Sequence, residues 1–133
     1  MMTNNLLKSV HTALAPAAIG PYSQAIQFQN LIFISGQLGL HPESGQLVTG
    51  GVALQTQQII QNLLNIGAAA GGKPNQFLKL TLYLTDLADF ETVNRILNDA
   101  LVEPFPARAT VGVAALPKGA AIEIDAIMAG SNG

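Results

Sequence analysis

Residues 52–85 read VALQTQQIIQNLLNIGAAAGGKPNQFLKLTLYLT, and this stretch decides the fold class. Apolar side chains recur at the helical period in its first half, which predicts an amphipathic helix over residues 52–70. Gly71-Gly72 ends that helix. Residues 77–85 then alternate apolar and polar side chains, which is typical of a half-buried strand. A helix followed directly by such a strand favours a mixed α and β domain.

The polar face of this helix carries no charged residue. It consists of Gln55, Gln57, Gln58, Gln61 and Asn62.

The remaining segments predict more strands and one more helix. The expected strands are residues 24–27, 31–38, 109–116 and 121–129, and the second helix is residues 90–102 with Asp89 as its cap. Alternation places Gly36 on the face of the second strand that carries Ile32 and Ile34. The last two strands flank Pro117-Lys118-Gly119, which predicts a hairpin.

These elements predict a two-layer α+β domain, with a mostly antiparallel sheet covered by two helices on one face. The other sheet face would stay bare in a single copy. The composition agrees, because 49% of the 133 residues are hydrophobic and only 11% are charged, where about 25% charged is usual. Burial of a bare face in an oligomer is the simplest way to keep such a chain soluble.

Several function classes are disfavoured. The net charge is −2 and the six basic residues are scattered, so we expect no nucleic-acid partner. No apolar run reaches the length of a membrane helix, so we expect no membrane association. There is no cysteine, and His11 and His41 are isolated, so we expect no metal site.

We expect one domain over residues 1–133, with residues 1–7 as a loose N-terminus. The first ten residues lack a charged segment followed by a long apolar core, so we expect no signal peptide and a cytoplasmic protein.

Three side chains have noteworthy positions. Arg108 follows the rigid segment Pro104-Phe105-Pro106, which would place its guanidinium reproducibly. Glu123 shares a strand face with Asp125, and Tyr22 follows Gly20-Pro21 directly. From pattern alone these residues suggest an anion-binding pocket and no more. The plainer alternative is that the two carboxylates point to solvent from an edge strand, that Tyr22 covers the edge of the core, and that Asn94 lies on an exposed helix face.

Five segments, in order over about residues 8–129, resemble motifs of the RidA/YjgF family. They are residues 17–24 (AAIGPYSQ), 34–38 (ISGQL), 90–94 (FETVN), 105–111 (FPARATV) and 116–124 (LPKGAAIEI).

This resemblance implies a chorismate-mutase-like α+β fold, assembled as a homotrimer with active sites in clefts between subunits. It implies an enamine/imine deaminase that needs no cofactor. The substrates would be reactive 2-imino acids, 2-iminobutanoate and 2-iminopropanoate, hydrolysed to 2-oxo acids and ammonia. Pyridoxal-phosphate-dependent dehydratases release these imines, so the protein would protect the cell from damage by them.

The resemblance also implies residue roles. Arg108 would bind the substrate carboxylate, because a planar guanidinium can donate two parallel hydrogen bonds to a carboxylate. Glu123 would hold the attacking water and transfer protons. The substrate-binding residues would be Tyr22, Ser35, Gly36, Asn94, Ala109 and Thr110.

The chain departs from the family pattern near Arg108. Ala109 stands where serine or threonine is common, and Thr110 stands where members often have cysteine. The segment between Asn94 and Phe105 is shorter than expected, and its usual aromatic residues are replaced by Ile96, Leu97, Leu101 and Val102.

Two other functions remain open. One is a non-catalytic trimer that binds a small anion such as a 2-oxo acid and acts as a regulator or chaperone-like protein. The other is a ribonuclease or translation inhibitor, and the scattered basic residues argue against it.

Overall fold

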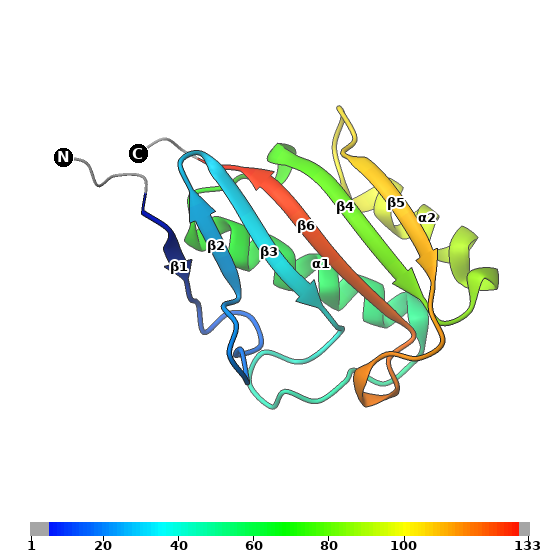
Figure 1. The fold of residues 1–133 in the computed structure, drawn as a ribbon. Helices are drawn as coiled ribbons and strands as arrows, with labels where there is room; N and C mark the ends of the chain where they lie inside the picture. Colours follow the sequence, from blue (N-terminus) through cyan, green and yellow to red (C-terminus); the bar gives the residue numbers. More distant parts are fainter. Residues whose placement is uncertain (1–5, 131–133) are drawn as a thin grey trace.

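The computed structural model describes residues 6–130, which form two layers (Figure 1). A six-stranded sheet is covered on one face by two helices, which confirms the α+β class. The strands are β1 (Lys8–Val10), β2 (Ala25–Phe28), β3 (Leu31–Gln37), β4 (Phe77–Leu84), β5 (Ala107–Gly112) and β6 (Ile122–Ala129), and the helices are α1 (Val52–Ala69) and α2 (Phe90–Ala100).

The predicted loose N-terminus falls mostly outside the described residues. Leu6 and Leu7 are described, and both are exposed and precede β1. The short strand β1 itself is an element that the sequence did not reveal. No helix within residues 6–130 is both long and apolar enough to cross a membrane.

The strand order is β1-β2-β3-β6-β4-β5, and every neighbouring pair is antiparallel except β4 with β5. Strand β6 therefore lies at the centre of the sheet. Its residues alternate strictly between buried and half-buried, as expected for a strand with helices on one side only. The buried face of the sheet meets α1 and α2 through Ile32, Ile34, Leu80, Leu82, Leu84, Ile122, Ile124, Ala126 and Met128.

The predicted hairpin between the last two strands is wrong. Strand β5 pairs in parallel with β4, and β6 inserts between β3 and β4. The turn Pro117–Gly119 is a short 3-10 helix in the connection from the sheet edge to the sheet centre. The physical reason is burial, because the central position sets the apolar face of β6 against α1 and between β3 and β4.

Helix α1 ends where the sequence predicts. The Gly72 amide donates to the Gly67 carbonyl at 2.8 Å, and Gly71 has φ of 85°, a conformation that glycine adopts without steric cost. The predicted polar face needs correction, because Gln55 and Asn62 are buried. Both face the interior, where Gln55 accepts a hydrogen bond from the Ala121 amide and Asn62 donates one to the Leu40 carbonyl.

Helix α2 begins at Phe90 as predicted but is not capped by Asp89. A short 3-10 helix, Leu87–Asp89, precedes it, and the Asp86 carboxylate accepts from the Ala88 amide at 2.9 Å. Asp89 already has helical backbone angles, whereas a capping side chain needs an extended backbone to reach the first free amides.

Strand β3 contains a β-bulge that changes which face its last residues occupy. Ile34 pairs with Ala126 but Gln37 pairs with Ile124, so the register shifts between them. Gly36 consequently lies on the open face of the sheet and not with Ile32, as simple alternation predicted. Bulges of this kind redirect side chains next to functional sites.

The open face of the sheet is partly apolar. Phe33 of β3 is 43% exposed and Val111 of β5 is 42% exposed, while Ile127 of β6 is half-buried. No element of the described chain covers these side chains (Figure 1).

Candidate active site

Arg108 lies on the helix-covered side of the sheet. It is the second residue of β5 and stands in register with Leu80 of β4, whose side chain is buried beneath the helices. The Arg108 guanidinium carbon lies 5.3 Å from the centroid of the Phe90 ring. This cation–π contact orients the guanidinium at the start of α2.

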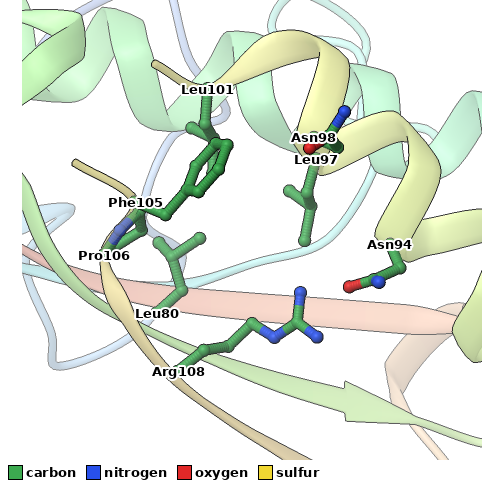
Figure 2. A pocket seen from close by; sticks show the side chains of 8 residues that line it. All are labelled: Leu80, Asn94, Leu97, Asn98, Leu101, Phe105, Pro106 and Arg108. Atoms are coloured by element: carbon green, nitrogen blue, oxygen red, sulfur yellow. The ribbon is translucent and has the colours of Figure 1, made fainter. Parts of the chain in front are cut away.

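A pocket of about 260 Å³ opens beside Arg108, between α2 and the segment that leads into β5 (Figure 2). The guanidinium points toward Asn94 of α2 across this pocket. Its lining residues are Leu80, Asn94, Leu97, Asn98, Leu101, Phe105, Pro106 and Arg108.

Glu123 lies on the opposite face of the sheet. It stands in register with Tyr83 of β4, on the open side of the central strand β6. The alternative that Glu123 points outward from an edge strand is therefore wrong. Its side chain contributes to a second, larger pocket of about 480 Å³, which is also lined by Tyr22, Gly36, Gln37 and Lys118.

The surroundings of Glu123 favour its protonated form. Partial burial raises the pKa of its carboxyl, and the nearby Asp125 carboxylate raises this pKa further. Asp125 accepts a hydrogen bond of 2.8 Å from the Tyr83 hydroxyl. That hydrogen bond is the main cause of a raised pKa of Tyr83, followed by burial and by the charges of the two carboxylates. A raised pKa makes a carboxyl a stronger proton acceptor when it is ionised, which suits a group that takes and returns a proton during catalysis.

Gly36 allows the Glu123 carboxyl to occupy its position. A Cβ atom on Gly36 would lie 2.9 Å from the Glu123 carboxyl carbon and still closer to one of its oxygens. The bulge in β3 thus brings bare backbone against the candidate catalytic carboxyl. A side chain at this position would displace that carboxyl.

The segment that carries Tyr22 is held by the buried side chain of Gln24. The Gln24 amide nitrogen donates to the carbonyls of Thr12 at 3.0 Å and Pro16 at 2.8 Å, and its oxygen accepts from the Thr12 amide at 2.7 Å. The Ala15 carbonyl is a further acceptor at 3.4 Å. Gln24 therefore fixes the backbone at Thr12 and Pro16, ahead of the segment that lines the larger pocket and ends at Tyr22.

Tyr22 itself is 53% exposed at the rim of the larger pocket. Its backbone amide donates to the Gly20 carbonyl at 2.8 Å, and its hydroxyl accepts from the Ile19 amide at 3.4 Å. Tyr22 therefore remains accessible to a ligand or to a second chain.

The remaining predicted binding residues fall in different places. Asn94 lies with Arg108, whereas Ser35 lies outside both pockets and donates to the Ser23 carbonyl at 2.6 Å. Ala109 and Thr110 continue β5, with Ala109 on the open face and Thr110 on the helix-covered face. One chain therefore brings Arg108 to Asn94, and Glu123 to Tyr22 and Gly36, but does not bring the two groups together.

Some residues in or beside the two pockets had no predicted role. Phe90 and Gln24 lie within the family-like motifs, but their chemistry suggested no ligand contact. Phe90 lies beside Arg108, and Lys118 lines the larger pocket, because segments that are distant in the sequence meet in the fold. Helical spacing from Asn94 to Leu97 and Asn98 was the one local signal that could have indicated a shared face.

Within residues 6–130, no group of three histidine, aspartate or glutamate side chains is placed to hold a metal ion.

Comparison with known proteins identifies the family. A family model described as Endoribonuclease L-PSP matches residues 12–129. The 2-iminobutanoate/2-iminopropanoate deaminase of Mus musculus is 50% identical over 95% of this chain and 93% of its own length. The Homo sapiens protein of the same name is 48% identical over 95% of this chain and 92% of its own length.

A solved structure agrees with these relatives. The crystal structure of RidA from the Antarctic bacterium Psychrobacter sp. PAMC 21119 superposes with a TM-score of 0.89 at 46% identity, covering 92% of this chain and 98% of that one. The chain therefore belongs to the RidA/YjgF family, the one whose family model is described as Endoribonuclease L-PSP.

Proposed function

We propose that this protein is an imine deaminase that hydrolyses 2-iminobutanoate and 2-iminopropanoate. The observation that carries the proposal is the oriented guanidinium of Arg108 at an open pocket, in a chain half identical to a deaminase of that name over nearly its whole length. A 2-imino acid is a small carboxylate with a C=N bond, and Arg108 offers the two parallel donors that a carboxylate accepts.

The chemistry needs one water and two proton transfers. Glu123 takes a proton from water as the oxygen bonds to the imine carbon, and it returns a proton to the nitrogen. Glu123 then takes the hydroxyl proton of the resulting carbinolamine and passes it to the amino nitrogen as the C–N bond breaks, so imine and water become 2-oxo acid and ammonia. A single carboxyl with a raised pKa can perform both transfers, and Glu123 has that property.

We propose further that the working site spans two copies of the chain within a homotrimer. Arg108 and Glu123 lie on opposite faces of one sheet, so one copy does not direct both toward one small substrate. The partly apolar open face supports the assembly, since burial of Phe33 and Val111 against another copy removes apolar surface from water. In such a trimer, Arg108 of one copy would meet Glu123 and Tyr22 of the next.

RNA is not the substrate in this proposal, although the description of the family model names an endoribonuclease. The chain has only six basic residues and a net charge of −2. Binding to a phosphate backbone depends on clustered lysine and arginine side chains.

The test is a deaminase assay on the purified protein, with a threonine dehydratase supplying 2-iminobutanoate. We expect the protein to accelerate loss of the imine, and we expect Arg108→Ala to lower kcat/KM by at least about 30-fold. Arg95→Ala is the matched control, because Arg95 is an exposed arginine on α2 outside both pockets.

Full acceleration by folded Arg108→Ala would refute the role of Arg108. Tight binding of a 2-oxo acid without turnover of the imine would instead favour the alternative of a non-catalytic regulatory trimer. Tight RNA binding at physiological salt would support the ribonuclease alternative.

A further inference from the structure

We infer that the pocket beside Arg108 receives the side chain of the substrate and selects 2-imino acids with a bulky, branched apolar side chain over those with one or two carbons. This inference rests on the proposed deaminase function and adds the substrate class.

The pocket has a polar side and an apolar side. Arg108 and Asn94 form the polar side, and the guanidinium points toward the helix (Figure 2). The apolar side consists of Leu80, Leu97, Leu101, Phe105 and Pro106. A carboxylate held at Arg108 therefore has an apolar surface next to it, and a substrate with a carboxylate and an adjacent hydrocarbon group matches both sides.

The apolar side has a firm floor and an open rim. Leu80 and Leu97 are 1% and 3% exposed, and both belong to the core packed between β4 and α2. Phe105 is 49% exposed and Leu101 is half-buried. The Leu101 amide donates to the Leu97 carbonyl at 2.9 Å, which ties the rim to the last turn of α2. A ligand can therefore enter past the rim and rest on the floor.

The size of the pocket decides between short and long side chains. A volume of about 260 Å³ exceeds the needs of a methyl or ethyl group, which would leave much of the apolar wall in contact with water. Each further methylene buried on that wall is worth about a fourfold gain in binding. A four-carbon branched side chain, such as that of the leucine-derived imine, has three more carbons to bury than the alanine-derived imine.

The test compares imines that differ only in this side chain. An amino-acid oxidase generates the imines from alanine, 2-aminobutanoate, leucine and phenylalanine, and semicarbazide traps the imine that remains. We expect kcat/KM for the leucine-derived imine to exceed that for the alanine-derived imine by at least about tenfold.

Leu101→Phe tests the pocket directly, because the larger ring fills space at the rim. We expect it to lower the leucine-to-alanine ratio of kcat/KM by at least about tenfold. Leu54→Phe is the matched control, since Leu54 is 45% exposed on α1 and lies outside the pocket, and its ratio should equal that of the wild type. If Leu101→Phe does not fold, Phe105→Ala replaces it, and loss of the ring from the wall should also lower the ratio.

The outcomes separate the two claims. Preference for the alanine-derived imine, or a ratio that neither pocket variant changes, would overturn the inferred side-chain pocket and leave the deaminase function standing. Hydrolysis of none of the four imines would overturn the proposed function, and the inference with it.

Discussion

Glu123 is held where its charge is unfavourable. Its carboxyl is partly buried and lies near Asp125 on the same strand face, and both conditions raise its pKa above the ordinary 4.5. Arg108 is positioned differently, because the Phe90 ring orients its guanidinium while the pocket keeps it accessible. The two residues with proposed chemical roles thus combine exposure to a ligand with a defined orientation.

We expect Glu123→Gln to stabilise the folded protein at pH 7 while lowering deaminase activity. A raised pKa means that the folded state binds the proton more tightly than the unfolded chain does. The ionised carboxyl therefore costs stability, and this cost appears as pH rises from the unfolded pKa through the folded one. The gain should stay below about 1 kcal/mol, because the carboxyl is partly exposed and solvent screens it.

Thermal denaturation at pH 7 and at pH 4 checks this expectation. The gain should be present at pH 7 and nearly absent at pH 4, where Glu123 is largely protonated. The matched control is Glu103→Gln, at an exposed position in the connection to β5. A lower Tm of Glu123→Gln at pH 7 would contradict the direction of the pKa shift.

The bulge of β3 is the element that places the candidate catalytic carboxyl. It moves Gly36 to the open face, directly against Glu123, and returns Gln37 to the buried face. Simple alternation over residues 31–38 missed this shift, because a bulge adds a residue on one strand and shows itself only in the register with the partner. The glycine in the strand was the only local signal.

Gly36→Ala should damage activity far more than stability. The added methyl group occupies the position of the Glu123 carboxyl, and the end of that side chain can rotate away at little cost to the fold. A displacement of about 1 Å at a reacting group can lower the rate about 100-fold. Steady-state kinetics together with Tm measures both effects.

Gly112→Ala is the matched glycine control, because the nearest atoms to a Cβ there belong to the flexible side chain of Leu87, at 3.3 Å. Wild-type kcat/KM in Gly36→Ala would show that the Glu123 carboxyl does not need its position.

The whole molecule has one sheet face covered by helices and one that remains open. The open face carries Phe33, Val111 and Ile127 together with the Tyr83–Asp125 hydrogen bond. The composition is consistent with burial of this face, since a chain with only 11% charged residues has few charges to keep a large surface soluble. The proposed trimer would bury the face and unite Arg108 with Glu123.

We expect the wild type to have three times the chain mass of 13.8 kDa in solution, and Phe33→Asp to dissociate into single copies. A carboxylate would then be buried without a partner in the interface, which costs several kcal/mol. Analytical ultracentrifugation measures the mass, and the same samples should lose deaminase activity on dissociation.

Leu54→Asp serves as the control, because Leu54 is similarly exposed but lies on α1, in the other layer. A monomeric wild type with full activity would refute both the trimer and the shared site.

Local sequence patterns were sufficient to predict individual helices and strands and the family of this protein. Helical periodicity over residues 52–70 and alternation over residues 77–85 predicted α1 and β4 nearly to the residue, because both patterns follow from backbone geometry within a few residues. The deaminase class came instead from the resemblance of five short segments, spread along the chain, to motifs of the family.

The pairing of distant segments, and the sheet face that each candidate residue occupies, emerge only in the folded chain. Strand β6 lies between β3 and β4 and not beside β5, so Glu123 is central and faces away from Arg108. The side chains of Gln55 and Asn62, expected on the polar face of the helix, are buried instead. Gln55 accepts a hydrogen bond from the Ala121 amide at 2.8 Å, and Asn62 donates one to the Leu40 carbonyl at 3.1 Å. The reason is that strand order and buried hydrogen bonds depend on partners tens of residues away, which no local pattern specifies.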